Sequence, residues 1–255
     1  MNRFKAAGIH VLLSLFIVIT TLVTMYLLWY PGNYFTLMGG GKLITLIGTV
    51  DVFLGPLLTL IIFKSGKKSL KFDLFCIGLV QIAALTYGVY VMFESRPVFT
   101  VFNKDKFQIA AVVDIAPKEL AKAKKGQWQQ LSVTGPKIVA VGTPDKANKK
   151  ETTFAKVVGT NAYRYPRLYD EYKNHQNEVI KAGQALTKLS ERSIENKSVV
   201  DGFLKSIDRP ESDFLFLPVS SELAEMSVIV DAKSAEIQTI INANPRAVEQ
   251  VKSSH

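Results

Sequence analysis

Long apolar segments fill the first third of the chain, and shorter mixed segments follow. Predominantly apolar runs cover residues 7–30, 43–63 and 72–93. Each run is long enough to cross a hydrocarbon core about 30 Å thick, which takes roughly 20 helical residues. Because a backbone in that medium must satisfy its own hydrogen bonds, each run is expected to be a helix. The pattern predicts a membrane protein with three transmembrane α-helices in residues 1–95.

Lysine residues are distributed unequally between the two short links that join these runs. The link at residues 64–71 contains four lysines, whereas the link at residues 31–42 contains one. Short loops that are rich in Lys and Arg stay in the cytoplasm. We therefore predict a protein of the bacterial inner membrane, with a cytoplasmic N-terminus and with residues 96–255 in the periplasm.

Aromatic residues gather at the ends of the runs that would meet the outer side of the membrane. Trp and Tyr are enriched where a transmembrane segment reaches the interface between lipid and water. The sequence thus predicts an outer aromatic belt formed by Trp29, Tyr30, Tyr34 and Phe35 together with Tyr87, Tyr90 and Phe93.

Residues 96–255 have the pattern of a single α+β domain of ordinary size. Polar turns at residues 103–106 and 231–235 predict two hairpins. A short helix is expected from Pro117 to Lys125, and Ser198 with Asp201 resembles the cap of a later helix. The expected fold is an antiparallel sheet with packed helices, and its strands are predicted at residues 98–103, 107–114, 137–142, 214–218, 226–230 and 237–241.

The strongest helical pattern in this domain covers residues 168–193. Its apolar positions recur in alternating steps of four and three residues, which places them on one face of a helix. That face can pack on the sheet of the same chain, or it can dock a partner helix or a second copy. The positions are Leu168, Tyr172, His175, Val179, Ala182, Leu186 and Leu189.

Composition gives no sign of catalysis or of a bound cofactor. The net charge of +9 is spread along the chain, whereas nucleic-acid binding requires cations clustered on one face. Cys76 lies in the third run, and outside the apolar runs only His175 and His255 are histidines, so an ordinary His/Cys zinc site cannot form. Phosphate-binding loops and the GxSxG motif are absent from the sequence. We expect a non-enzymatic protein without metal or cofactor that does not bind nucleic acid.

One set of lysines has near-helical spacing in the domain that follows the apolar runs. A solvated face accounts for this set in the simplest way, and contact with lipid headgroups or with an acidic partner is the alternative. The set comprises Lys118, Lys122, Lys124 and Lys125.

Polar residues inside the apolar runs are the most informative positions for function. Asp51 lies midway along the second run, where a charge costs several kcal/mol and usually has a partner or a function. At about 1.5 Å per helical residue, Gln81 falls at nearly the same depth, and Ser14, Thr20 and Thr21 bracket it. Pro56 is expected to kink the helix just past Asp51.

Three roles fit this polar layer. It can be a hydrogen-bond clasp that holds the three helices together. It can engage a charge in the transmembrane segment of a partner, and the groove shaped by Pro56 would favour that role. It can also conduct an ion or a proton, although that role calls for more intramembrane polar groups than are present here.

Several segments resemble the type IV pilin accessory proteins of the TfpX/TfpZ type. The resemblance is dense over residues 1–115 and thinner beyond, and it implies an inner-membrane protein that acts with a type IV major pilin and supports its stability or assembly into pili. No catalytic residues come with that family. The segments that carry the resemblance are MNRFKAAGIH at residues 1–10, WYPG at 29–32, DVFLGPLLTL at 51–60, GKKSLKFDL at 66–74, SRPVF at 95–99, FLP at 216–218 and VIVD at 228–231.

A membrane-anchored periplasmic sensor or envelope-complex subunit is the competing class. Its weakness is the expected cytoplasmic face of only a few residues, which leaves no room for an output module. We therefore expect an accessory factor whose partners are the pilin and the inner-membrane lipid. Its membrane helices would meet the pilin's membrane helix, and its periplasmic domain would meet the pilin's globular head.

The lysine asymmetry generates the first testable prediction, which concerns topology. A reporter that is active only in the periplasm should be active when it is fused after residue 96, and silent when it is fused near Lys67. Enzymatic activity of the two fusions in intact cells measures this directly. The reverse pattern would overturn the predicted orientation.

Overall fold

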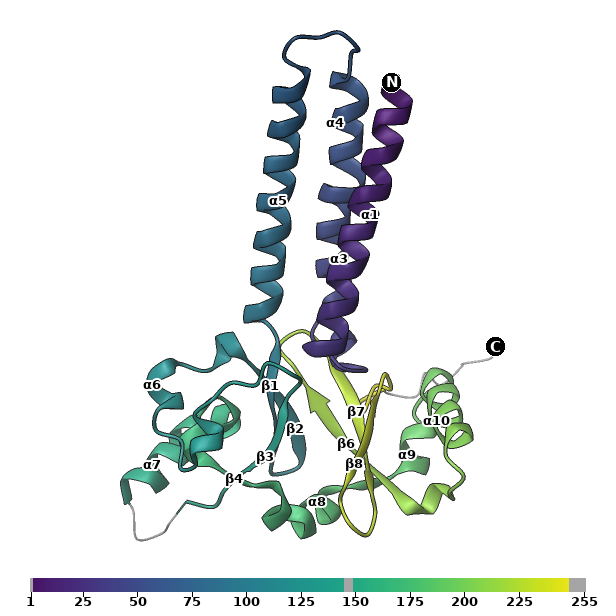
Figure 1. Cartoon of the computed structure of the whole chain (residues 1–255). Helices are drawn as coiled ribbons and strands as arrows, with labels where there is room; N and C mark the ends of the chain where they lie inside the picture. Colours follow the sequence, from purple (N-terminus) through teal and green to yellow (C-terminus); the bar gives the residue numbers. More distant parts are fainter. Residues whose placement is uncertain (1, 145–148, 248–255) are drawn as a thin grey trace, which may run out of the picture.

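The structure is a computed structural model that describes residues 2–144 and 149–247, so His255 lies outside the described residues. Figure 1 shows two parts: a stem of parallel-running helices, and a head built on one β-sheet with short helices around it. We call residues 3–28 and 40–94 the stem, residues 29–39 the junction segment, and residues 96–247 the head.

Two long helices define the stem, α1 (Arg3–Leu28) and α5 (Leu70–Glu94). The Asn2 side chain caps α1 by accepting a hydrogen bond from the Lys5 N–H at 2.9 Å, which satisfies a backbone donor that has no partner within the helix. Both helices are long and apolar enough to cross a membrane. They correspond to the first and third predicted spans.

The second predicted span consists of three helical pieces: α3 (Gly40–Gly48), the π-helical segment η1 (Thr49–Leu54) and α4 (Gly55–Ile62). Pro56 lies in the first turn of α4, and a proline ring clashes with the carbonyl four residues before it. A π-helical turn widens the backbone at that place. The break that Pro56 predicts therefore takes the form of a π-helical segment that contains Asp51. Only α1 and α5 are single helices of spanning length in the described chain.

Packing within the stem leaves much apolar surface exposed. Helices α1 and α5 both pack against the middle helix formed by α3, η1 and α4. Their outward faces carry large exposed side chains, among them Leu12, Phe16, Val80 and Tyr87. Such a continuous apolar surface is unfavourable in water and is matched to hydrocarbon.

One mixed sheet of eight strands organises the head, in the order β4-β3-β1-β2-β6-β7-β8 with β5 paired to β6. The predicted hairpins are both present, as β1–β2 and β7–β8. The strands are β1 (Pro97–Asn103), β2 (Lys106–Ala111), β3 (Lys137–Val141), β4 (Tyr169–Glu171), β5 (Gln184–Ala185), β6 (Phe214–Ser220), β7 (Glu225–Asp231) and β8 (Ile237–Ile241).

The prediction of an antiparallel sheet is wrong for two pairs of strands. Strand β3 runs parallel to β1, and β6 runs parallel to β2. Parallel neighbours need a long crossover rather than a tight turn, and the long stretches of chain before β3 and before β6 provide it. Alternation of apolar residues within a strand reports its faces but not the direction of its neighbour.

Short helices surround the sheet, and their boundaries differ from the predicted ones. Helix α6 ends at Leu120 rather than at Lys125. Helix α10 begins at Ile194, because the Ser193 side chain accepts the N–H of Asn196 at 3.1 Å and forms the cap; Ser198 lies inside the helix. The helices are α6 (Pro117–Leu120), α7 (Lys149–Val158), α8 (Gln176–Ala182), α9 (Leu186–Ser190) and α10 (Ile194–Ser206).

The long helix predicted over residues 168–193 is absent. Residues 169–171 form β4 and pair with β3, and residues 184–185 form β5. The helical parts that remain are a 3-10 turn at residues 172–175 and the short helices α8 and α9. A side chain at Gly183 would clash with Leu215, so the chain passes close to β6 at the break between them. Sheet pairing has overridden a helical pattern here, as tertiary context commonly does.

The junction segment joins stem and head into one hydrophobic core. It contains the short helix α2 (Tyr34–Leu37). Tyr30 and Leu37 are completely buried, in a cluster that runs from Val18 and Met25 of the stem to Phe102 and Val228 of the sheet. The aromatic belt predicted around Tyr30 is therefore wrong for that residue, because its ring packs inside the protein.

Hydrogen bonds fix the junction segment at several points. Tyr30 donates to the carbonyl of Met92 at 2.6 Å, and the Asn33 side chain donates to the carbonyl of Ile240. Ser221 of the head donates to the carbonyl of Leu37 at 2.6 Å. The end of α5, the junction segment and the far strands of the sheet are thus tied together.

The junction generates the second prediction. Leu37→Ala should lower the stability of the head by about 2–5 kcal/mol, because it removes a fully buried side chain and leaves a cavity. The control is Leu27→Ala on the exposed face of α1. Thermal unfolding of the detergent-solubilised protein measures both, and equal midpoints would show that the junction does not stabilise the head.

Candidate functional site

The strongest candidate site is a polar cluster inside the stem that joins all three of its helices. His10 of α1 contacts Thr59 of α4 through Nδ1 and Oγ1 at 2.6 Å, and Gln81 of α5 through Nε2 and Oε1 at 2.7 Å. Gln81 Nε2 donates to the backbone carbonyl of Asp51 at 3.0 Å. The cluster therefore runs from α4 through α1 and α5 to η1.

The chemistry of the partners fixes the proton positions in this cluster. A backbone carbonyl can only accept, so Gln81 Nε2 must face Asp51 and Oε1 must face His10. His10 then carries a proton on Nε2. Its Nδ1 is paired with the Thr59 hydroxyl, so both ring nitrogens have partners, as a clasp between helices requires.

The Asp51 carboxylate is left out of this network. Its side chain is 5% exposed, and neither carboxylate oxygen has a hydrogen-bond partner in the described parts of the chain. The nearby Gln81 amide donates to the backbone carbonyl of Asp51 and not to its carboxylate. This amide occupies the space that a Cβ atom would take at position 55, where the residue is glycine. A buried carboxylate without a partner is costly, and more so in hydrocarbon.

The structure brings together only some of the residues predicted for the polar layer. Asp51 is buried and its carbonyl accepts from Gln81, and Ser14 and Pro56 are buried within the stem. Thr20 is exposed, and its carbonyl accepts from Thr24 at 2.8 Å within α1, so it lies outside the buried cluster, and its contact with a partner stays a prediction. Residues a few positions apart on a helix point to different faces. The depth of a residue along the helix therefore does not determine whether its side chain faces the other helices.

His10 and Thr59 belong to the site although sequence reasoning did not assign them to it. The signal for His10 was present, because an ionisable residue within an apolar run deserves the same attention as Asp51. No comparable signal marks Thr59, because threonines are common in such runs.

The head residues predicted to form a binding face are mostly in its core. Leu168, Val179, Leu186 and Leu189 are at most 1% exposed. Tyr172 is partly buried and donates to the carbonyl of Ala235 at 2.5 Å. These side chains pack inside the head and do not form a continuous surface.

His175 is buried between two carboxylates. Its Nδ1 is 2.9 Å from Glu178 and its Nε2 is 3.1 Å from Asp170. Burial raises the pKa of Asp170, but hydrogen bonds from the Glu171 N–H, Asn174 and His175 outweigh it, so its pKa lies below the ordinary value. No group of His, Cys, Asp and Glu residues in the described chain is arranged to hold a metal ion.

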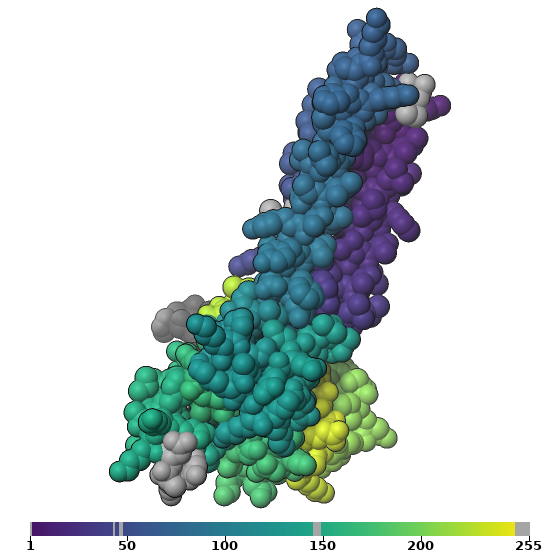
Figure 2. Space-filling model, turned by 60° about the vertical axis from the view of Figure 1, so that its left-hand side comes forward, coloured from purple at the N-terminus to yellow at the C-terminus, as the bar shows by residue number. Residues whose placement is uncertain are grey.

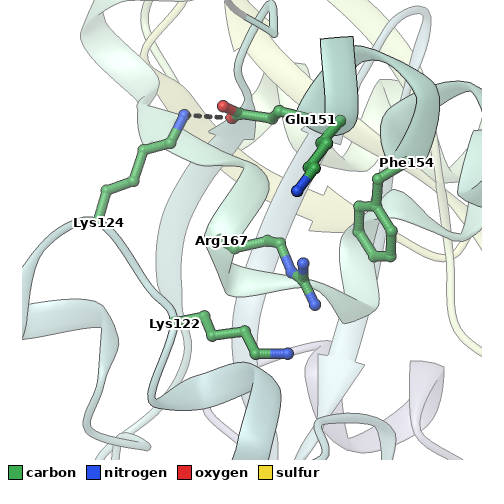
Figure 3. A pocket seen from close by; sticks show the side chains of 6 residues that line it. Lys122, Lys124, Glu151, Phe154 and Arg167 are labelled. Atoms are coloured by element: carbon green, nitrogen blue, oxygen red, sulfur yellow. Dashed lines mark ion pairs between the residues drawn. The ribbon is translucent and has the colours of Figure 1, made fainter. Parts of the chain in front are cut away.

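A basic pocket forms on the head where the predicted lysine face meets α7. Figure 3 shows Lys122, Lys124, Phe154 and Arg167 lining this pocket, with the Lys124 side chain directed toward Glu151. Its volume is about 400 Å³, and Lys150 and Glu151 complete its lining. Figure 3 also shows the ion pair of Lys124 with Glu151, at 2.8 Å.

Arg167 is held rigidly at the bottom of this pocket. Its Nε and Nη2 both donate to Glu119, at 2.6 and 2.5 Å, and its guanidinium lies 4.1 Å from the centre of the Phe154 ring. Lys122 pairs with the same carboxylate at 2.8 Å. Burial raises the pKa of Glu119, yet Arg167 and Lys122 bring it below its ordinary value. The Glu119 carboxylate thus pairs with two cations, Arg167 and Lys122, and the pocket keeps an excess of positive charge.

Comparison with known proteins places this architecture in a family. The chain is 31% identical to the fimbrial assembly protein of serogroup E1 from Dichelobacter nodosus, over 93% of each chain. It is 30% identical to the protein of serogroup I, again over 93% of each, and 39% identical over 47% of its length to that of serogroups C1 and C2, of which 92% is covered. No family model matches the chain, and no solved structure does. The chain belongs to the family of fimbrial assembly proteins, which supports a role in type IV pilus assembly.

Proposed function

We propose that this protein is a non-enzymatic accessory factor of the inner membrane that binds a cognate type IV major pilin and supports its stability or assembly into pili. The observation that carries the proposal is the similarity to fimbrial assembly proteins along nearly the whole chain. The apolar stem is consistent with it.

The proposed topology has three membrane crossings. Helices α1 and α5 have the length for two of them, and the middle helix runs beside them from Gly40 to Ile62. Three crossings place the head on the side opposite the N-terminus, and the lysines near residue 67 make that side the periplasm. Residues 1–95 would then act in the membrane and residues 96–255 outside it.

Asp51 is the proposed contact with the partner's membrane helix. Its carboxylate is buried and has no hydrogen-bond donor among the residues that the structure describes. Because α1 and α5 pack on the middle helix rather than closing around it, a fourth helix has surface to pack on. A donor or cation on that helix would remove the cost of the unpaired carboxylate. The cluster of His10, Thr59 and Gln81 holds the helices in place.

Choice among pilins is assigned to the head. Membrane helices of pilins are expected to be alike, so discrimination needs surfaces that differ. The buried residues from Leu168 to Leu189 support the head from within. The basic pocket around Lys122, Lys124 and Arg167 is exposed and charged, and it suits an acidic surface on the pilin head.

The third prediction concerns Asp51. Asp51→Leu should leave membrane insertion intact, because it removes the cost of burying a carboxylate. It should reduce pilin levels or piliation, because it also removes the proposed contact with the partner helix. Asp51→Asn keeps hydrogen bonding and should be milder. Thr45→Val, at an exposed position of α3 whose hydroxyl donates to the Gly41 carbonyl of the same helix, is the matched control. Immunoblots of pilin and counts of surface pili measure the effect, and normal pili in both Asp51 variants would remove Asp51 from the binding site.

The fourth prediction concerns the head. Exchanging residues 96–255 together with the junction segment 29–39 for those of a relative should transfer pilin preference to the relative's pilin. The junction segment must be included because its buried side chains belong to the core of the head. If preference follows the stem instead, the membrane helices carry recognition and the assignment to the head is wrong.

Charge reversal isolates the contribution of the pocket. Lys122→Glu with Lys124→Glu should weaken pilin binding in a manner that depends on salt concentration. Lys197→Glu with Lys205→Glu changes the same charge on exposed positions of α10 and serves as the control. Equal binding by the two double variants would exclude the pocket.

A further inference from the structure

Three large apolar side chains of the head remain exposed close to the base of the stem. Val113 is 66% exposed, Val133 is 56% exposed and Leu223 is 64% exposed. Single exposed apolar residues are ordinary on a protein surface. These three are distinguished by their position, because each lies in a segment bonded to an end of a stem helix or to the junction segment.

Arg96, just after α5, holds the segments that carry Val113 and Val133. Its carbonyl accepts the N–H of Val112 at 3.2 Å, and its Nε donates to the carbonyl of Ser132 at 3.0 Å. Its guanidinium lies 3.6 Å from the centre of the Phe93 ring in the last turn of α5. Val113 and Val133 are therefore next to the point where α5 enters the head.

Leu223 lies at the corresponding point below the middle helix. Its Cδ1 occupies the space that a side chain at Gly39 would take, immediately before α3. The Ser221 hydroxyl fixes the same turn to Leu37. Both entry points of the stem thus have an exposed apolar side chain beside them.

One arginine connects the two sides of this surface. Arg164 pairs with Asp114 at 3.4 Å and with Glu222 at 2.6 Å, and these carboxylates adjoin Val113 and Leu223 in sequence. Arg164 therefore links the segment that carries Val113 to the turn that carries Leu223. Figure 2 shows the head broader than the stem, so that the head extends outward around the stem base.

We infer that Val113, Val133 and Leu223 are immersed in the lipid interface, so that the head rests on the bilayer instead of standing away from it. The inference depends on the proposed membrane crossing of α1 and α5. If α5 spans the membrane, Arg96 lies at the headgroup level, and side chains bonded to its surroundings reach the boundary between headgroups and acyl chains. Apolar side chains at that depth are stabilised by the surface they remove from water.

The consequence for function is a fixed orientation of the head. Three lipid contacts on two sides of the stem base resist tilting, and they hold the basic pocket at a constant height above the membrane. A partner that is anchored in the same membrane would then bind the pocket with a smaller loss of orientational freedom.

Site-specific fluorescence in lipid nanodiscs tests this inference on the full-length protein. Single cysteines replace Val113, Val133 or Leu223 in a Cys76→Ala background and carry an environment-sensitive dye. We expect a blue-shifted emission, loss of fluorescence with nitroxide-labelled lipid, and protection from iodide. Val157→Cys on α7, an exposed position of the same residue type, should show the opposite behaviour.

A stem position separates failure of this inference from failure of the membrane assignment. Leu79→Cys lies on the exposed face of α5 and should be quenched by lipid in every case if α5 spans the bilayer. Lipid quenching at Leu79 with iodide quenching at all three head positions would overturn the lipid contact alone. Iodide quenching at Leu79 would overturn the proposed membrane crossing and the inference with it.

Discussion

The burial of the junction segment is the constraint on which the rest of the structure depends. Tyr30 and Leu37 are fully enclosed, and the core around them is continuous from α1 to the central strands of the sheet. A flexible tether between stem and head would leave domain motion free. Here, instead, the position of the stem determines the position of the head. A site in the stem and a site on the head are thereby held at a fixed separation, which suits a protein that contacts one partner at two places.

The stem has two polar features with opposite demands. The cluster of His10, Thr59 and Gln81 is satisfied internally, and such a network holds helices in one arrangement. The Asp51 carboxylate is buried and has no hydrogen-bond partner among the described residues. Such a group lowers stability and usually has a partner or a function. The π-helical segment lies between α3 and the Gly55-Pro56 turn, and it contains Asp51. Irregular helical turns of this kind are frequent at functional sites.

Much of this organisation was predictable from the sequence, and the exceptions have physical causes. The long apolar runs predicted α1 and α5, and short β-rich runs bounded by polar turns predicted β1, β2, β3, β6, β7 and β8 close to their observed ends. The pattern at residues 168–193 failed because a spacing of three and four residues also fits short helices whose apolar residues face different parts of a core. Strand direction and the burial of Tyr30 depend on contacts between distant segments, which local patterns do not report. For the site, Asp51 was predictable because an ionisable residue inside an apolar run usually has a partner or a function. His10 carries the same signal.

Binding of the major pilin is the central claim, and isolation of the native protein tests it most directly. The protein would be cross-linked in living cells, purified from their membranes in mild detergent, and its cross-linked partners identified by mass spectrometry. The account predicts that the major pilin of the same cell is the principal partner, with cross-links to both stem and head. Recovery of the protein without pilin, from cells that contain both, would contradict it.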